Sequence, residues 1–314
     1  MPLPARVDYA LPASLRATLA AGPSGRHVAP LDPARAVLLV HDMQRYFLRA
    51  FADDCAAYRG AVTATARLLD AARGAGVPVV YTAQPGDQHP DDRGLMTQVW
   101  GPGITAAADD VDVVAELAPR DGDVVLVKHR YSAFVRSDLD DRMRAWGRDQ
   151  LVVTGVYGHI GVLATATDAF MRDLAPYVVG DALADFSLAD HERTLAVARS
   201  VGAVVLGADD AVAALTAPSD ATPAAWLPWL RDAVARALGD DGDAREIAAR
   251  LVDDPAADVF EAGLDSLRCF ALLDDLADVG LDVDFTDLVQ HGSLGVVLDR
   301  ITAAGLPAPA AAHA

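Results

Sequence analysis

Acidic, amide and cationic side chains follow successive apolar runs of this sequence. Asp42 comes directly after the first run, Gln84 and Arg93 follow the second, and Lys128 ends the third. A fourth run leads into a turn, residues 156–161, of a kind that holds the nucleophile in many hydrolases. This turn contains no Ser, Thr or Cys. The convergence of these groups predicts a functional site whose chemistry proceeds without a nucleophile from the turn.

Lys128 is the single lysine among 26 cationic residues, the other 25 being arginine. Arginine and lysine differ in shape, in hydration and in how readily their pKa shifts. A site that needs a compact ammonium group would keep its lysine while arginine replaced lysine elsewhere. Chance survival of one lysine is the alternative explanation.

These side chains require a scaffold that brings strand ends together, and the sequence predicts one. Short apolar, β-branched runs bounded by turn residues alternate with helix-like segments. This alternation predicts an α/β fold with a doubly wound parallel sheet covered by helices on both faces. Ligands of such folds bind beyond the carboxyl ends of the strands. The expected strands are 36–41, 77–83, 123–128, 150–155, 177–180 and 203–206, and the expected helices are 56–73, 138–146, 160–172 and 190–200.

The last third of the chain has a different pattern, which predicts a second domain. Residues 214–224 are rich in Pro, Ser, Ala and Thr and are expected to form a linker after a first domain of residues 1–213. Beyond the linker the apolar pattern is helical only. Residues 225–306 are expected to form a small four-helix domain, followed by a disordered tail at 307–314. The expected helices are 227–238, 244–251, 266–276 and 294–304.

Composition argues against several classes of protein. The formal net charge is −19, and residues 218–314 contribute about −12 of it with 18 acidic and 6 basic residues, which argues against nucleic-acid binding. No apolar run approaches the ~18 residues of a membrane helix, and Arg6 and Asp8 interrupt any signal-peptide pattern. We therefore expect a cytoplasmic protein, with Cys55 and Cys269 as reduced thiols. HxH and CxxC spacings are absent, so no metal site is expected.

Short motifs across about residues 5–210 carry a resemblance to a known family. The motifs are HDMQ, YTAQPGDQ, DRGL, WGPG, GVYGHIGV, TDAF and DALADFS. They resemble the isochorismatase-like, or cysteine-hydrolase, superfamily, whose usual catalytic triad is Asp, Lys and Cys. The resemblance implies that the triad positions are Asp42, Lys128 and Gly161, with glycine in place of the cysteine. True isochorismatases also lack this cysteine, so the resemblance favours them over the amidase branch.

Isochorismatases cleave a vinyl ether, and such a group is attacked by a proton at its methylene carbon. The resemblance implies that Asp42 is the general acid and that the resulting oxocarbenium ion takes up water. The hemiketal then collapses to pyruvate and 2,3-dihydroxy-2,3-dihydrobenzoate. Burial would raise the pKa of Asp42, as an acid at neutral pH requires, whereas Lys128 beside it would lower that pKa. The sequence leaves this balance open.

The resemblance also implies which side chains hold the substrate. Gln84 and Arg93 would bind its polar groups, and the planar guanidinium of Arg93 suits a carboxylate. Phe47 and Trp100 would form apolar walls of the pocket. Ordinary core packing is the alternative role for these two aromatic residues.

The turn after the fourth strand would contribute mainly its backbone. The resemblance implies a cis peptide bond between Val156 and Tyr157, with Tyr157 and Gly158 contacting the substrate. The family commonly has alanine at the position of Gly158, so glycine there would loosen the pocket wall. His159 is expected to be structural rather than catalytic.

The string DVFEAGLDSLRCFALLDDL places Ser266 directly before a predicted helix of the second domain. A serine at a helix N-terminus with an acidic neighbour is the simple explanation. The string also resembles the phosphopantetheine attachment signature of carrier domains, which implies that Ser266 carries a covalent 4′-phosphopantetheine cofactor. The implied partners are a phosphopantetheinyl transferase, an aryl-adenylating enzyme and the condensation domain of a nonribosomal synthetase. The acidic surface suits basic partners.

Together the two domains resemble the bifunctional isochorismatase/aryl carrier proteins of catechol siderophore and related nonribosomal peptide pathways. Relatives with the first fold usually self-associate, so we expect a homodimer through residues 1–213. Two alternatives stay open. One is phenazine-type hydrolysis of 2-amino-2-deoxyisochorismate in nearly the same pocket. The other is a catalytically idle fold that serves as a docking platform for the carrier.

Overall fold

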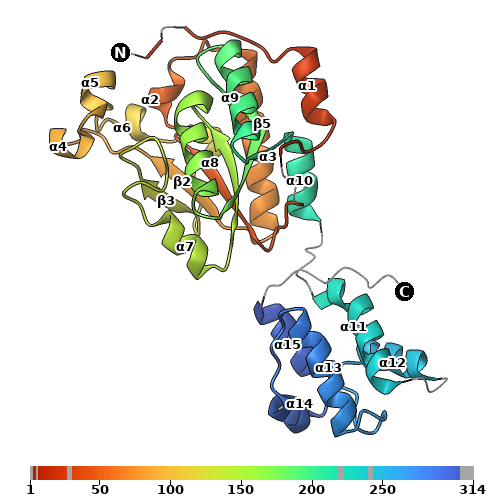
Figure 1. Ribbon diagram of the computed structural model, residues 1–314. Helices are drawn as coiled ribbons and strands as arrows, with labels where there is room; N and C mark the ends of the chain where they lie inside the picture. Colours follow the sequence, from red (N-terminus) through yellow and green to blue (C-terminus); the bar gives the residue numbers. More distant parts are fainter. Residues whose placement is uncertain (1–2, 5, 27–29, 218–222, 240–242, 305–314) are drawn as a thin grey trace. The chain divides into compact units, whose positions relative to one another are not determined.

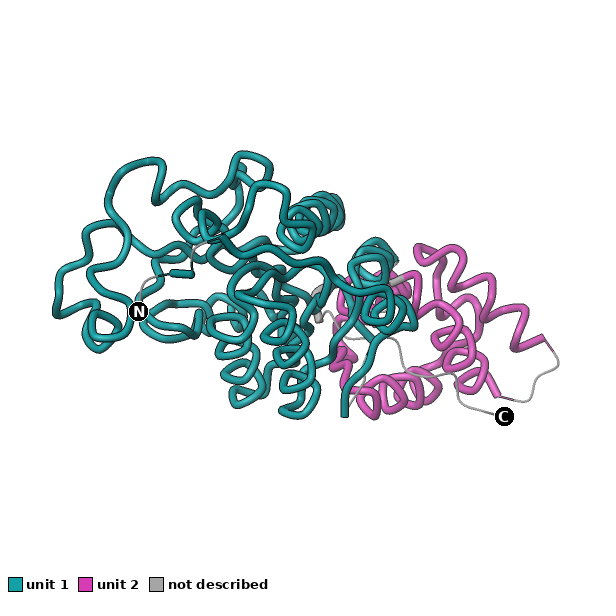
Figure 2. Tube along the Cα trace, turned by 90° about the horizontal axis from the view of Figure 1, so that it is seen from above, with its two compact units in different colours: residues 1–217 teal, residues 218–314 magenta. Residues whose placement is uncertain are grey.

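The computed structural model describes residues 3–304 except for residues 5, 27–29, 218–222 and 240–242. The chain divides into two compact units, residues 1–217 and 218–314, which Figure 2 distinguishes by colour. Part of the predicted linker 214–224 and the whole predicted tail 307–314 lie outside the described residues. Each unit has its own hydrophobic core and is described by itself.

A six-stranded parallel sheet forms the centre of the N-terminal unit in the described residues (Figure 1). Its strands lie in the order β3-β2-β1-β4-β5-β6, and every neighbouring pair is parallel. The doubly wound α/β fold is therefore confirmed. The strands are β1 (Ala36–His41), β2 (Val79–Ala83), β3 (Val124–Val127), β4 (Gln150–Gly155), β5 (Ala175–Leu183) and β6 (Val204–Leu206).

The strands β1 and β4 pair at the middle of this sheet, in register from Ala36 opposite Gln150 to His41 opposite Gly155. Every residue of both strands is buried, because both faces of the sheet are covered, and this explains their continuous apolar runs. The chain continues from β1 toward β2 and from β4 toward β5, on opposite sides. The strand order thus reverses between β1 and β4, which is where open α/β sheets bind ligands.

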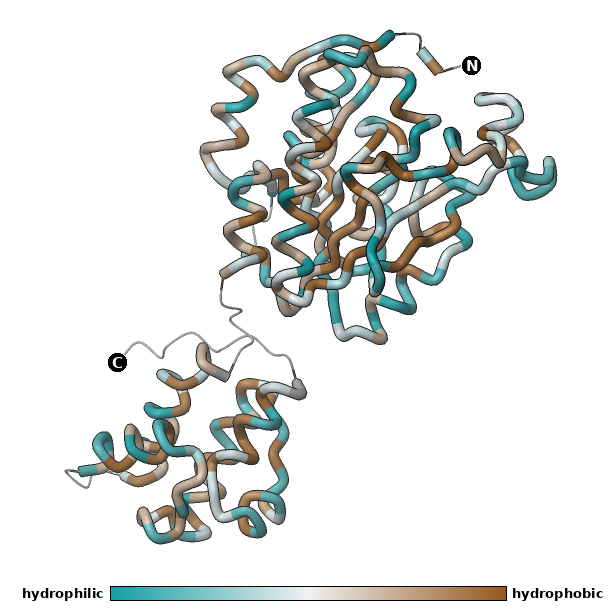
Figure 3. Tube along the Cα trace, turned by 180° about the vertical axis from the view of Figure 1, so that it is seen from behind, coloured by the Kyte–Doolittle hydropathy of each residue, from teal (hydrophilic) through white to brown (hydrophobic). Residues whose placement is uncertain are grey.

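Two sets of helices cover the two faces of the sheet. Leu38 and Val40 of β1 belong to the core shared with one set, whereas Val37 and Leu39 belong to the core shared with the other. The central strands accordingly consist mainly of hydrophobic residues, which Figure 3 shows in brown. The first set is α3 (Ala56–Gly74) and α10 (Ala208–Thr216), and the second is α7 (Leu139–Ala145), α8 (Leu163–Phe170) and α9 (Leu188–Ser200).

Several short helices lie outside the predicted pattern, since three to nine residues give little apolar periodicity to read. The predicted helix 160–172 begins instead as a π-helical turn, η2 (Gly158–Val162), which continues into α8. The helix α10 runs to Thr216, into the predicted linker. The remaining short elements are α1 (Ala13–Ala20), α2 (Arg45–Leu48), α4 (Pro90–Arg93), α5 (Met96–Trp100), α6 (Ala108–Val111) and η1 (Ala115–Leu117).

The C-terminal unit is helical throughout its described residues. Its core gathers Trp226, Leu230, Leu251 and Leu272 from three helices. The predicted domain had four helices, and the structure adds a fifth, α14, which spans only seven residues. None of the helices in the described part of the chain is long and apolar enough to span a membrane. The helices are α11 (Pro223–Leu238), α12 (Ala244–Asp253), α13 (Ser266–Asp278), α14 (Phe285–His291) and α15 (Gly295–Ala304).

Candidate active site

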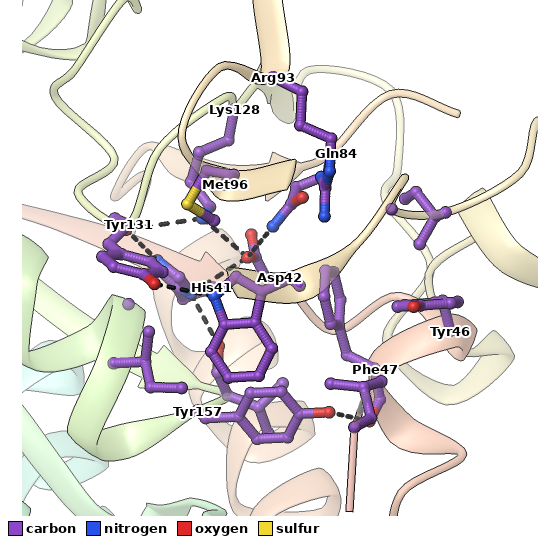
Figure 4. Close-up of a pocket in the computed structure, with 17 residues that line it drawn as sticks. His41, Asp42, Tyr46, Phe47, Gln84, Arg93, Met96, Lys128, Tyr131 and Tyr157 are labelled. Carbon is purple, nitrogen blue, oxygen red and sulfur yellow. Dashed lines mark hydrogen bonds and ion pairs between the residues drawn. The ribbon is translucent and has the colours of Figure 1, made fainter. Parts of the chain in front are cut away.

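A cavity of about 590 Å³, counting its open mouth, lies at the carboxyl ends of β1 and β4 (Figure 4). Four strand ends and the loop after β2 contribute to it, as the sequence predicted. The cavity brings together eight of the predicted N-terminal site residues: Asp42, Phe47, Gln84, Arg93, Trp100, Lys128, Tyr157 and Gly161.

Asp42 lies at the centre of the polar part of the cavity and is 5% exposed. Its backbone adopts a φ of 50°, in the left-handed region that few residues other than glycine enter. Lys128 Nζ lies 2.8 Å from Oδ2 of Asp42, and the hydroxyl of Thr82 donates to Oδ1 at 2.6 Å. The side-chain amide of Gln84 donates to Oδ2 at 3.5 Å (Figure 4). The carboxyl group therefore has polar partners on both oxygens.

Two opposing influences act on the protonation of Asp42. Burial raises the pKa of this carboxyl, but the attraction of Lys128 and the hydrogen bonds from Lys128 and Thr82 outweigh burial and hold the pKa below its ordinary value. The balance that the sequence left open thus favours an ionised Asp42 in the free protein. A general acid at this position must gain its proton when the surroundings of Lys128 change.

Lys128 is 2% exposed and is fixed by more than Asp42. Its ammonium also donates to the carbonyl oxygen of Arg130 at 2.8 Å and approaches that of Tyr131 at 3.5 Å. Three oxygen atoms thus surround a compact group with three donors. This arrangement gives a physical reason why lysine, not arginine, stands here.

Gln84 is positioned by the side chain of Gln44, and Arg93 by the backbone of the loop that follows β2. The amide of Gln44 pairs with both backbone groups of Gln84, at 2.7 and 2.9 Å. Arg93 is 4% exposed, and its Nε donates to the carbonyl of Gly101 at 2.6 Å. Burial lowers the pKa of Arg93, yet a guanidinium stays protonated at neutral pH. No carboxylate in the described part of the chain pairs with Arg93, so its remaining donors suit an anionic ligand.

Aromatic rings form the opposite wall of the cavity. The rings of Phe47 and Tyr157 meet edge to face at 6.1 Å, and the hydroxyl of Tyr157 donates to the carbonyl of Phe47. Trp100 is held by a 2.8 Å hydrogen bond from Nε1 to the hydroxyl of Tyr131. Phe47 and Tyr157 thus belong to the hydrophobic core and also line the cavity. Phe47 therefore has both of the roles considered from the sequence, core packing and cavity wall.

The turn after β4 contains the expected cis peptide bond between Val156 and Tyr157. Gly158 is not among the residues that line the cavity, so its contact with the substrate stays a prediction. A Cβ there would point to Asp185 and Thr194, at 2.8 and 3.1 Å from their side-chain oxygens, so glycine at this position does not loosen the pocket wall. The π-helical turn directs Gly158 away from the cavity and Gly161 toward it.

His159 also lies outside this cavity. Its Nδ1 and its backbone N–H both contact the buried carboxylate of Asp185, at 2.5 and 2.7 Å. This pairing fixes the turn to the segment after β5, in keeping with the structural role expected for His159.

Sequence reasoning missed several residues that line the cavity. Tyr131 follows the predicted Lys128 by three positions, and Tyr46 is the neighbour of the predicted Phe47, so proximity in sequence was the available signal. The missed residues are Leu3, His41, Tyr46, Met96, Gly103, Ile104, Tyr131, Val156 and Ile160. No group of three His, Cys, Asp or Glu side chains in the described residues could hold a metal ion.

The predicted attachment serine lies in the other unit. Ser266 is exposed and is the first residue of α13, a helix of 13 residues. Asp265 caps this helix by accepting from the N–H of Arg268 at 3.0 Å, while Leu264 is buried in the core. An accessible hydroxyl at a helix N-terminus, where N–H groups and the helix dipole favour a phosphate, fits a phosphopantetheine arm.

Comparison with known families decides the identity. Residues 36–210 match the isochorismatase domain, and residues 228–301 match the phosphopantetheine attachment site. The chain belongs to the isochorismatase family. The isochorismatase match coincides with the parallel sheet and its cavity, and the attachment-site match coincides with the helices around Ser266.

Some relatives are similar to most of this chain, and others to about two thirds of it. "Isochorismatase" of Bacillus subtilis is 39% identical over 269 residues, covering 84% of this chain and 85% of that protein. "Enterobactin synthase component B" of Escherichia coli is 39% identical over 297 residues, covering 94% and 96%. "Phenazine biosynthesis protein PhzD" of Pseudomonas fluorescens is 48% identical over 211 residues, covering 67% and 98%. A solved cysteine hydrolase of Pseudomonas syringae has a TM-score of 0.56 at 25% identity, covering 60% and 95%.

Proposed function

We propose that the N-terminal unit hydrolyses the vinyl ether of isochorismate to pyruvate and 2,3-dihydroxy-2,3-dihydrobenzoate, with Asp42 as the general acid. The observation that carries this proposal is the buried cluster of Asp42, Lys128 and Gln84 in a cavity whose turn offers no nucleophile. Arg93 lines the same cavity and has no carboxylate partner among the described residues. A vinyl ether needs a proton donor and anchors for anionic groups rather than a nucleophile. The same features argue against a catalytically idle fold.

The substrate itself supplies the change that Asp42 requires. Isochorismate carries two carboxylates, and Arg93 and Lys128 are the cations that line the cavity among its described residues. A substrate carboxylate that engages Lys128 weakens the attraction that keeps Asp42 ionised, so the effect of burial prevails and the pKa of Asp42 rises. Substrate binding is thereby coupled to proton uptake by Asp42.

The proton then moves in a cycle that restores Asp42. The carboxyl group of Asp42 gives its proton to the methylene carbon, and the positive charge develops on the ether carbon and oxygen. Water adds to that carbon and releases a proton to the Asp42 carboxylate. The bond between the hemiketal carbon and the ring oxygen then breaks, the ring oxygen takes up a proton while the hemiketal hydroxyl loses one, and pyruvate forms.

A second candidate substrate is 2-amino-2-deoxyisochorismate. The phenazine relative is 48% identical over 211 residues, whereas the other two are 39% identical over longer alignments, and this favours the candidate. The presence of the C-terminal unit favours isochorismate. A relative whose alignment covers 94% of this chain, and therefore both units, is an enterobactin synthase component. Offering the two vinyl ethers separately and measuring pyruvate release discriminates them: the higher kcat/KM identifies the substrate, and no release from either one contradicts the proposal.

We propose that the C-terminal unit is an aryl carrier domain whose Ser266 bears the phosphopantetheine arm. The arm supplies a thiol that holds an acyl group as a thioester. The acidic character of residues 218–314 suits recognition by basic faces of a phosphopantetheinyl transferase, an aryl-adenylating enzyme and a condensation domain. The free thiols of Cys55 and Cys269 are in keeping with a cytoplasmic location.

We also propose that the N-terminal unit forms a homodimer. The strand β3 is an edge of the sheet, and Val125 and Val127 on it are 49% and 54% exposed. Apolar side chains on an open strand edge suit burial against a second copy. Light scattering of the purified chain tests this state, and a monomer at all concentrations contradicts it.

A further inference from the structure

The imidazole ring of His41 fills the space directly in front of Gly161. A Cβ built on Gly161 would overlap Cε1 of His41 and would lie 2.8 Å from its Nε2. Gly161 has no left-handed φ, so its backbone would accept alanine. The need for glycine at this position is therefore a need for space, and the space is taken by one side chain.

His41 cannot easily move aside, because its ring is buried and one ring nitrogen is hydrogen-bonded to a backbone oxygen. Nδ1 lies 2.8 Å from the carbonyl oxygen of Val156, and Nε2 lies 3.3 Å from that of Tyr131. The residue is 1% exposed, and burial lowers its pKa, so the ring is neutral at pH 7. A neutral ring donates from one nitrogen, and the shorter distance assigns that proton to Nδ1. Its 3.8 Å approach to Asp42 is then not an ion pair.

The position of His41 connects the two halves of the cavity. It precedes Asp42 in the chain, and its hydrogen bond reaches the backbone at the start of the turn after β4. The residue thus fixes the distance between the proposed acid and the turn wall that includes Gly161.

We propose that His41 and Gly161 form an interlocked pair: the imidazole occupies the volume of a side chain at position 161 and holds the turn against Asp42. His41 is a positioning residue in this account, and the pair restricts the cavity to chemistry without a nucleophile at position 161. The inference rests on the proposed acid-catalysed hydrolysis for its catalytic consequence, but the interlock itself does not.

The test is a double-mutant cycle with pyruvate release and thermal unfolding as separate readouts. The variants are Gly161→Ala, His41→Asn and the double variant, with Gly60→Ala as the control because a Cβ there meets nothing within 4 Å. Asparagine is smaller than histidine and keeps a donor for the Val156 carbonyl. We expect Gly161→Ala alone to reduce kcat about 10²-fold, since small displacements of reacting groups have effects of this size.

In the His41→Asn background, the additional Gly161→Ala change is expected to reduce kcat by no more than about threefold, because coupled neighbours are not additive. The unfolding midpoint is expected to follow the same pattern, with Gly161→Ala lowering it in the wild-type background and much less in His41→Asn. KM should change less than kcat, because a displaced acid affects the chemical step more than binding.

Equal effects of Gly161→Ala in both backgrounds would overturn the interlock, as would a harmless Gly161→Ala. If Gly161→Ala does not fold, recovery of a folded protein in the double variant supports the proposal and failure of both contradicts it. Unfolding midpoints report on the interlock even if the proposed hydrolysis is wrong, whereas pyruvate release by Asp42→Asn reports on the hydrolysis alone.

Discussion

The ammonium of Lys128 lies 2.8 Å from the carboxylate of Asp42, and both side chains are almost completely removed from solvent. Each charge compensates the burial of the other, so removing one partner leaves a buried ion without its counter-ion. The pair therefore does two things. It keeps Asp42 ionised in the free protein, and it makes the protonation of Asp42 depend on what else Lys128 binds.

Replacement of Lys128 by arginine tests whether the site needs an ammonium or only a positive charge. We expect Lys128→Arg to reduce kcat/KM at least about 10²-fold, because a planar guanidinium cannot fit among the three oxygens around Nζ without displacing them. Arg144→Lys on the exposed face of α7 is the control and should be silent. A fully active Lys128→Arg protein would show that charge alone suffices.

Replacement of both cysteines tests the absence of thiol chemistry. Cys55 and Cys269 are buried, so alanine is the least disruptive substitute. We expect the Cys55→Ala, Cys269→Ala protein to release pyruvate at close to the wild-type rate. Loss of turnover in a double variant with an unchanged circular dichroism spectrum would reopen covalent catalysis.

The fold was predictable where burial alone decides the structure. The strands β1 and β4 begin and end where their apolar runs do, because every residue of both is buried. The strand β5 extends beyond the predicted strand 177–180 at both ends. The prediction was too short because Ala175 and Asp181, which lie within β5, are residue types that rarely favour strands. Helices of a few residues, such as α5, were missed because their start and end depend on tertiary contacts.

The site was predictable to the extent that it consists of strand ends. Asp42 and Lys128 were found because a parallel sheet collects such residues at one edge. That Gly158 would not line the cavity could not be foreseen, because the direction of each residue in a π-helical turn cannot be read from the sequence. His41 was missed because it is the last residue of a buried strand, and only the geometry shows that its ring faces Gly161.

The pairing of His159 with Asp185 predicts a pH dependence of stability. The hydrogen bond to Asp185 raises the pKa of His159 above its ordinary value of 6.5, against the opposing effect of burial. The folded state thus binds this proton more tightly than the unfolded state. The resulting stabilisation is complete below pH 6.5 and is lost as the pH rises through the folded-state pKa.

Thermal unfolding of wild type and His159→Gln measures this effect. Between about pH 6 and about pH 9, the wild type should lose more stability than the variant, because glutamine does not titrate. The exposed His89→Gln serves as the matched control and should behave as the wild type. Parallel pH profiles for wild type and His159→Gln would contradict the assignment of a charged His159.

The two units should work independently, since each has its own core. A fragment ending at Ala217 is expected to release pyruvate as the full chain does. A fragment of residues 223–314 is expected to gain the phosphopantetheine mass from a transferase and then to accept an aryl group. Ser266→Ala should prevent both steps, as judged by intact mass. Modification of the Ser266→Ala protein, or a folded fragment that is never modified, would refute the carrier assignment.

The role of Asp42 is the central claim, and Asp42→Asn changes it with the least disturbance. Asparagine can still accept the hydrogen bond from Thr82, but it leaves Lys128 without a counter-ion, so a lower unfolding midpoint is expected. Kinetic measurements must therefore be made well below that midpoint, with the folded fraction established by circular dichroism.

Pyruvate release from isochorismate by folded Asp42→Asn protein is the most direct measurement. Loss of the proton donor predicts a rate at least ~10²–10⁴-fold below that of the wild type, the range that general acid catalysis contributes. Turnover close to the wild-type rate by the folded variant would contradict acid catalysis by Asp42.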